Sequence, residues 1–223
     1  MAKLVWDQVG ERTYKTGVEQ AAIYPMGEGG AYGQGEAWNG LTSVTESPSG
    51  AEPTALYAND KKYVELMSAE EFGGTIEAYT YPDGFAACNG QAEVVSGLKL
   101  TQQTRKPFAM VYKTLLGNDT EGTKHGYELH VVYNARVKPS ETANSTVNDS
   151  PEAATMSWEF TTTPVEIEGY DPTAHIVLDS TTINAEKLKA VEDKLYGTTE
   201  AEPTLLMPDE LIALVKGEDA ISG

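Results

Sequence analysis

The stretch from Glu36 to Asp60 constrains the fold most, because it has the composition of a loop but carries large apolar side chains. A flexible linker is depleted in such residues, since burial cannot offset an ordering entropy of roughly 1–2 kcal/mol per backbone residue. Loops longer than about 12–15 residues in compact domains are usually functional or disordered. We therefore interpret residues of about 27–60 as a long assembly loop that folds onto a partner or onto the chain's own core. Its large apolar residues are Trp38, Leu41, Val44, Leu56 and Tyr57.

The length and composition bound the class of protein. A chain of 223 residues, 40% hydrophobic and 22% charged, can form one sizeable core, and we expect a single domain over residues 1–223. No apolar run approaches the ~18 residues of a membrane span, and the first residues lack the apolar core of a signal peptide. We therefore expect the chain to be made in the cytoplasm. Cys88 is the only cysteine, so no intrachain disulfide can form.

The charge is strongly acidic. Asp and Glu number 34 against 16 Lys and Arg, which gives a formal net charge of −18. This surface repels the phosphate backbone and argues against sequence-specific DNA binding. Repulsion suits a conduit through which DNA passes without sticking, if the acidic groups face the lumen. The alternative is that the charge only keeps the protein soluble.

Several windows alternate apolar and polar residues with the two-residue period of a half-buried strand. The clearest covers 126–135. Its predicted apolar face consists of Tyr127, Leu129, Val131 and Tyr133. The turn-type residues at 117–122 predict a hairpin between this strand and one at 108–116. Further strands are expected at 62–67, 75–81, 98–103, 155–163 and 175–179.

Two amphipathic helices are expected near the end of the chain. Asn184 is a suitable N-cap, Gly197 is a suitable C′ residue, and three apolar residues between them recur at i, i+3 and i+7. A second helix starts with Pro208 at its first position, followed by two acidic residues at the positive end of the dipole. The polar stretch 198–203 suits an arm, so we expect a C-terminal helix and arm over about 184–223.

Many strands with helices at one end indicate a mainly β (α+β) fold. We expect an antiparallel β-sandwich or partly closed barrel flanked by an α-helix, with long assembly loops and a C-terminal arm. An exposed edge strand has unpaired amides and carbonyls, and pairing it with the next subunit of a ring removes that edge. A second mobile loop is expected at 139–151.

No pattern predicts catalysis. The glycines of 27–35 fail the dinucleotide fingerprint because Tyr32 stands where the third glycine is needed, and no Gly-Lys-Ser/Thr follows them. Cys88 is interpreted as a buried structural thiol. Neither close metal-ligand spacing nor an HExxH pattern is found among the histidines, which are His125, His130 and His175. We expect no catalytic, cofactor-binding or metal-ligating residue, no cofactor and no enzymatic activity.

Several strings spread over nearly the whole chain carry a family likeness. They are WNGL (38–41), TESPSGAEP (45–53), LYAND (56–60), SAEEFG (68–73), EAYTYP (77–82), NDSPEA (148–153) and WEFTTTPV (158–165). Together they resemble the major tail protein, or tail tube protein, of long-tailed bacteriophages and prophages with non-contractile tails. The strings are specific for relationship and carry no chemistry of their own.

The resemblance implies a structural virion protein that forms hexameric rings, stacked into a tail tube through which DNA is ejected into the host. It also implies two packed antiparallel sheets with a flanking helix and loops that join subunits. The implied partners are further copies of the chain, the tail terminator, tape measure and distal tail proteins, and phage DNA passing non-specifically through the lumen, with no membrane. The implied location is the virion tail, after assembly in the host cytoplasm.

Large apolar residues of the assembly loop are the predicted subunit interface, since aromatic and large aliphatic side chains dominate interface energetics. The predicted interface residues are Trp38, Leu41, Leu56 and Tyr57. The alternative is that they pack within their own subunit. A different class of function is a β-sandwich binding module, such as an adhesin or carbohydrate-binding domain, which 12 tyrosines against 4 phenylalanines would suit.

Overall fold

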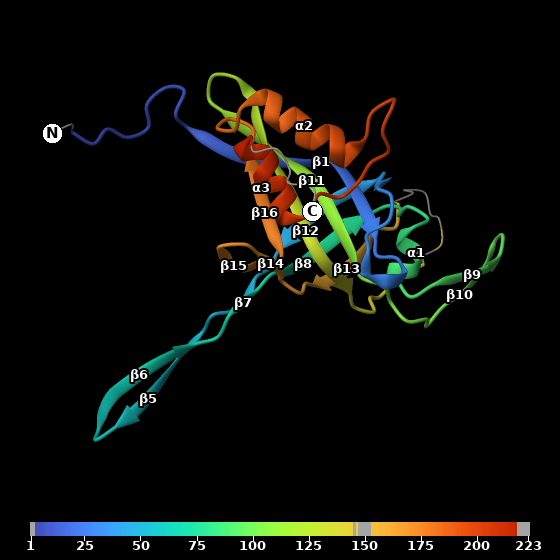
Figure 1. Cartoon of the computed structure of the whole chain (residues 1–223), viewed down its shortest axis with the longest axis horizontal. Coiled ribbons are helices and arrows are strands. Elements are labelled where there is room, and N and C mark those ends of the chain that lie inside the picture. The colour runs from blue at the N-terminus through green and yellow to red at the C-terminus, as the bar shows by residue number, and fades with distance from the viewer. Residues whose placement is uncertain (1–2, 145, 147–152, 218–223) are drawn as a thin grey trace.

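The computed structural model describes residues 3–144, 146 and 153–217 (Figure 1). Its centre is an eight-stranded antiparallel sheet. In spatial order the strands are β2 (Glu36–Ala37), β1 (Thr13–Pro25), β11 (Phe108–Asn118), β12 (Gly122–Val137), β13 (Met156–Thr161), β8 (Gly73–Ala78) and β3 (Leu41–Glu46), and β16 (His175–Asp179) also pairs with β12. The path ends at β2 and β3, so the described strands do not close into a barrel. The predicted mainly β fold with flanking helix is confirmed.

β12 belongs to both layers of the sandwich. Its residues 128–132 pair with β16, whereas residues 136–137 pair with β13. A bulge at Asn134, whose φ is +49°, interrupts the alternation of side chains. Val132 before the bulge and Ala135 after it therefore face the same core. The sheet folds over along β12, so that β13, β8 and β3 cover the layer formed by β1 and β11.

Aromatic side chains fill the inner core between the two layers. The one-turn helix α1 (Phe85–Cys88) supplies Phe85, which is fully buried. The centroid of its ring lies 4.6 Å from that of Trp38, 5.2 Å from that of Trp158 and 5.4 Å from that of Phe108. Tilted and edge-to-face pairs of this kind add stability beyond the apolar area that they bury. Because these rings come from both layers, their cluster holds the sandwich together.

α2 (Ala185–Tyr196) and α3 (Pro208–Lys216) cover the other face of the β1, β11, β12 and β16 layer and enclose an outer core (Figure 1). The α2 prediction is confirmed, including its cap: the Asn184 side chain accepts hydrogen bonds from the backbone N–H groups of Glu186 and Lys187. The predicted inner residues of α2 are all buried: Leu188, Val191 and Leu195. α3 begins at Pro208 as predicted. Within the described residues, no helix is both long and apolar enough to cross a membrane.

The predicted C-terminal helix and arm, about 184–223, packs on the body as far as Lys216. Lys187 Nζ donates hydrogen bonds to the carbonyls of Val215 at 2.8 Å and Lys216 at 2.9 Å, and so joins the two helices. Leu206, between the helices, is buried. The polar stretch 198–203 connects α2 to α3, and its residues 198–202 are exposed, so its role as an arm stays a prediction. Parts of two predicted features lie outside the described residues: the loop at 139–151 and the string at 148–153.

The predicted hairpin of 108–116 and 126–135 is confirmed as β11 and β12. Its apolar face packs in the outer core below α2 and α3. The prediction that β12 is half-buried is wrong, because His130 and Val132 on its other face are buried too. The strands expected at 75–81, 155–163, 175–179 and 62–67 correspond to β8, β13, β16 and β6 (Lys61–Met67), and that at 98–103 ends early as β10 (Leu98–Leu100).

About half of the stretch predicted as a long loop, about 27–60, is strand, and the remainder is turn and irregular structure. After η1 (Glu28–Gly30) it contains β2, β3, β4 (Ser49–Gly50) and β5 (Pro53–Ala58). Leu41 and Val44 of β3 pack against the inner core, and the Thr and Ser residues near them are compatible with a strand. Outside the main sheet lie four two-stranded ladders: β5 with β6, β4 with β7 (Glu70–Glu71), β10 with β9 (Ala92–Val95), and β14 (Val165–Ile167) with β15 (Tyr170–Thr173).

Cys88 provides a test of the inner core. Its side chain is fully buried, and burial raises the pKa of the thiol to about 12. Because the thiolate is the reactive form, we expect iodoacetamide to alkylate the native protein at pH 8 at least about a thousandfold more slowly than the urea-unfolded chain. Mass spectrometry of timed samples measures both rates. Equal rates in the two states would show that this core is open.

Candidate assembly interface

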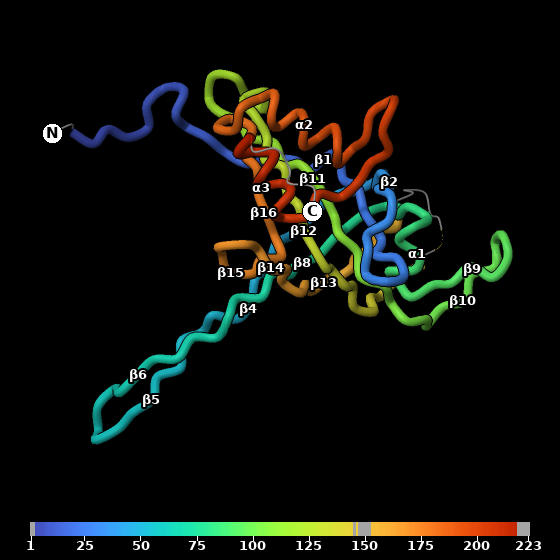
Figure 2. Tube along the Cα trace, in the orientation of Figure 1, coloured from blue at the N-terminus to red at the C-terminus, as the bar shows by residue number. Residues whose placement is uncertain are grey.

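Three segments leave the body, and each is too thin to enclose a core of its own (Figures 1 and 2). The N-terminal arm is residues 3–12, the long hairpin is β5 with β6 (residues 53–67), and the short hairpin is β9 with β10 (residues 92–100). In Figure 2 the long hairpin and the short hairpin extend in different directions from the body. All three carry exposed apolar side chains, which makes them the candidate interface.

The long hairpin turns at Asn59 and Asp60, whose φ angles are +52° and +60°. Two consecutive positive values are those of a type I′ turn, which matches the twist of the flanking strands. In the described part of the chain, β5 and β6 pair only with each other. A two-stranded hairpin alone is marginally stable in water. Its exposed apolar residues are Leu56, Tyr57, Tyr63, Val64, Leu66 and Met67.

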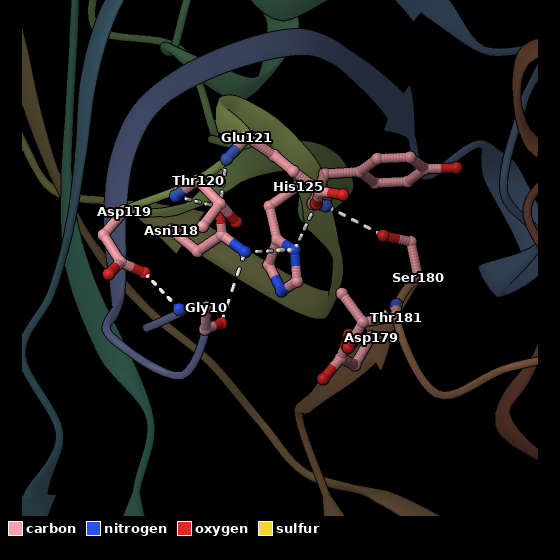
Figure 3. Close-up of polar contacts among 10 residues, drawn as sticks. Gly10, Asn118, Asp119, Thr120, Glu121, His125, Asp179, Ser180 and Thr181 are labelled. Atoms are coloured by element: carbon pink, nitrogen blue, oxygen red, sulfur yellow. Dashed lines mark hydrogen bonds and ion pairs between the residues drawn. The ribbon is translucent and has the colours of Figure 1, made fainter. Parts of the chain in front are cut away.

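The N-terminal arm is fixed to the body at its root (Figure 3). The Gly10 N–H donates to Asp119 Oδ1 at 2.9 Å, and Asn118 Nδ2 donates to the Gly10 carbonyl at 3.4 Å. Arg12 forms an ion pair with Asp119 at 3.7 Å. Asn118 Oδ1 also accepts from the backbone N–H groups of Thr120 and Glu121, which shapes the turn between β11 and β12. Beyond this root the arm exposes Leu4, Val5, Trp6 and Val9.

The short hairpin has the same character as the long hairpin but lies near α1. Its two strands pair only with each other among the described residues. In the part of the chain that the structure describes, one ion pair links it to the body, Lys99 with Asp83 at 3.8 Å, and the Asp83 side chain is fully exposed. Pairs in such positions contribute little to stability. Its exposed apolar residues are Val94, Val95, Leu98 and Leu100.

The root of the long hairpin is ordered by contacts from both of its legs. Glu46 ends β3 on the outgoing leg and accepts a hydrogen bond from Tyr112 Oη at 2.8 Å. Phe72 lies on the returning leg and stacks on His175, with ring centroids 4.2 Å apart. The legs are joined by the Ser47 N–H, which donates to the Gly73 carbonyl at 2.8 Å. These contacts fix the place where the two legs of the hairpin leave the body.

Two histidines meet at this root. His130 Nδ1 lies 3.1 Å from His175 Nε2 and 3.4 Å from Glu46 Oε1. Burial lowers the pKa of both imidazoles, that of His175 to about 4. Both rings are consequently neutral at pH 7. We call Glu46, His130 and His175 the root cluster.

The structure separates the predicted interface residues into two pairs. Trp38 is only 4% exposed, and its indole N–H donates to the Thr80 carbonyl at 2.8 Å. Leu41 is partly buried against the same inner core. Trp38 therefore packs within its own subunit, which was the alternative to an interface position. Leu41 keeps part of its surface exposed, and its place in an interface stays a prediction. Leu56 and Tyr57 lie exposed on the long hairpin, where the interface prediction continues to apply.

Sequence reasoning missed most of the candidate interface. The turn-type pair Asn59 and Asp60, whose residue types tolerate positive φ, is the sequence signal for a hairpin that would have extended the prediction to Tyr63, Leu66 and Met67. No comparable signal exists for the root cluster. His130 and His175 are 45 residues apart, and only the pairing of β12 with β16 brings them together.

Comparisons with solved structures find matches with low TM-scores and low sequence identity. No protein-family model and no curated protein matches the chain. The tube-terminating cap of the anti-feeding prophage has a TM-score of 0.36 and 12% identity, over 81% of this chain and 97% of the cap chain. The SPP1 tail tube has a TM-score of 0.39 and 12% identity, over 83% and 96% of the two chains.

A third solved structure is the PVC sheath-tube complex of an extracellular contractile injection system. It has a TM-score of 0.30 and 14% identity, over 72% of this chain and 88% of that one. All three TM-scores lie below 0.5, so these similarities do not establish a role for this chain.

Alanine substitutions of Trp38 and Tyr57 should differ in their effect on the free energy of unfolding of the single chain. Trp38→Ala empties a position in the inner core, so we expect it to lower the free energy of unfolding by about 3–5 kcal/mol. Tyr57→Ala removes a side chain that is 71% exposed, so the change should stay within about 0.5 kcal/mol. Urea unfolding of the dilute protein, followed by tryptophan fluorescence, measures the free energy of unfolding of each variant and of the wild type. A Trp38→Ala variant as stable as wild type would contradict the core assignment.

Proposed function

We propose that this chain is a structural subunit of a phage or prophage tail tube, which self-associates as hexameric rings stacked into a conduit for DNA. The observation that carries the proposal is the set of three extensions with exposed apolar side chains on one well-packed body. Apolar groups held on thin, ordered extensions are costly in water unless a partner covers them. A second copy of the chain is the occupant that the sequence strings favour.

The long hairpin supplies the main contact of this proposal. Both of its outer strand edges have backbone groups available for pairing, and an edge of this kind readily adds to another sheet. Tyr57 and Tyr63 present large rings with polar hydroxyls, the side-chain type that is enriched at interfaces. In the assembled tube, the hairpin lies across the body of a neighbouring subunit.

The charge supports the conduit. With a net charge of −18, a wall built from this chain repels DNA phosphates instead of binding them. Passage is then non-specific, since repulsion acts on the backbone and reads no bases. The terminator, tape measure and distal tail proteins meet the ends and lumen of the tube in this arrangement. No catalytic step is assigned to the chain.

Charged substitutions on the long hairpin test the proposal. We expect Leu56→Asp combined with Tyr57→Asp to abolish rings and tubes while leaving the circular dichroism spectrum and unfolding midpoint of the monomer nearly unchanged. The reason is that both side chains lie in water in the monomer and in a desolvated contact in the tube. Negative-stain electron microscopy and sedimentation velocity over a concentration series measure the assembly.

The matched control is Tyr79→Asp, because Tyr79 is an exposed tyrosine on the body next to β8. This variant should assemble as wild type does. Tubes formed by the hairpin variant would exclude the hairpin from the contact. A wild-type chain that stays monomeric at every concentration and binds glycans would favour a binding module instead.

A further inference from the structure

We propose that the root cluster, Glu46, His130 and His175, binds a divalent cation of the zinc class. Two imidazoles and one carboxylate are a ligand set suited to Zn²⁺ and its neighbours in the first transition row. One ligand atom from each residue lies within 4.8 Å of the others. The site is independent of whether the chain forms tubes.

The distances suit a tetrahedral ion. Metal–ligand bonds of about 2.0–2.2 Å at tetrahedral angles place neighbouring ligand atoms about 3.3–3.6 Å apart. The separations around His130 Nδ1 are 3.1 Å to His175 Nε2 and 3.4 Å to Glu46 Oε1. His130 Nδ1 and His175 Nε2 share a hydrogen bond in the absence of an ion, so binding replaces this bond and turns the two rings toward the ion.

The surroundings of His130 prepare it as a ligand. Its other ring nitrogen, Nε2, lies 2.9 Å from Thr114 Oγ1 and 3.5 Å from Glu128 Oε2, while Lys15 Nζ donates to the same Glu128 oxygen at 2.6 Å. With the proton on Nε2, the Nδ1 lone pair faces the other two ligands. A second hydrogen bond that orients the ring in this way is the usual support of a metal-bound histidine.

The rings are also held in place by stacking. Tyr112 lies parallel to His130 with centroids 4.5 Å apart, and Phe72 stacks on His175. Tyr112 Oη also donates to Glu46 Oε1, so one aromatic residue orients two of the ligands. The Glu46 side chain is 40% exposed, which gives a cation a path from solvent. A bound ion would tie β3 of one layer to β12 and β16 of the other at the root of the long hairpin.

The test uses the full chain after treatment with EDTA and dialysis. We expect isothermal titration with ZnCl₂ to show one ion per chain, and CoCl₂ to give the visible absorption of low-coordinate cobalt. Glu46→Gln and His175→Gln should each weaken zinc binding by at least about tenfold. Loss of a residue that only hydrogen-bonds to a metal ligand already lowers metal affinity by about 10–100-fold, and loss of a ligand should cost no less. Zinc should raise the thermal midpoint of wild type but not of these variants.

The matched control is His125→Gln, because His125 forms a separate histidine–carboxylate pair with Glu121 at 2.8 Å. It should bind zinc as wild type does. Histidine NMR signals of the wild type provide a readout that needs no variant: zinc should shift those of His130 and His175 and leave that of His125 in place. No stoichiometric uptake, unchanged affinity in both cluster variants, or a shift confined to His125 would each overturn the proposal.

Discussion

The fold depends on one strand, β12, which pairs with β11 along one side and with β16 and then β13 along the other. The bulge at Asn134 makes this possible because it changes which face the later residues of the strand present. Tyr32 supports the bulge: the Asn134 backbone N–H donates to its hydroxyl at 3.0 Å. A regular strand would direct Ala135 toward the helices, and the two layers would no longer share the inner core.

The body and the extensions are stabilised by different means. In the body, Phe85 and its aromatic neighbours form the inner core, and Lys113 is buried where its ammonium group pairs with Glu192 at 2.7 Å and lies over the Tyr127 ring. The two hairpins have ladder hydrogen bonds and the N-terminal arm has contacts at its root, but all three extensions bury few of their own side chains. The body therefore has a buried core of its own, whereas most apolar side chains of the extensions are exposed in the single chain.

Periodicity and capping rules predicted the parts of the fold that local sequence determines. Asn184, Gly197 and Pro208 mark the helix boundaries because capping and backbone geometry act within a few residues. The β3 strand was missed because its partner β8 is distant in sequence and its own composition resembles a loop. The candidate interface was only partly predictable: Leu56 and Tyr57 are apolar in a polar context, whereas the burial of Trp38 depends on Phe85 and Trp158 from other elements.

The root of the long hairpin has a consequence for the order of folding. β5 and β6 are adjacent in sequence and can pair within microseconds, while β1 must find β11 across the chain, which is slow because the intervening loop has to close. The place where the hairpin leaves the body, however, depends on Glu46 and Phe72 contacting residues of β11, β12 and β16. The hairpin can thus form on a nascent chain before its position relative to the body is set. Its native position requires that the sandwich has already formed.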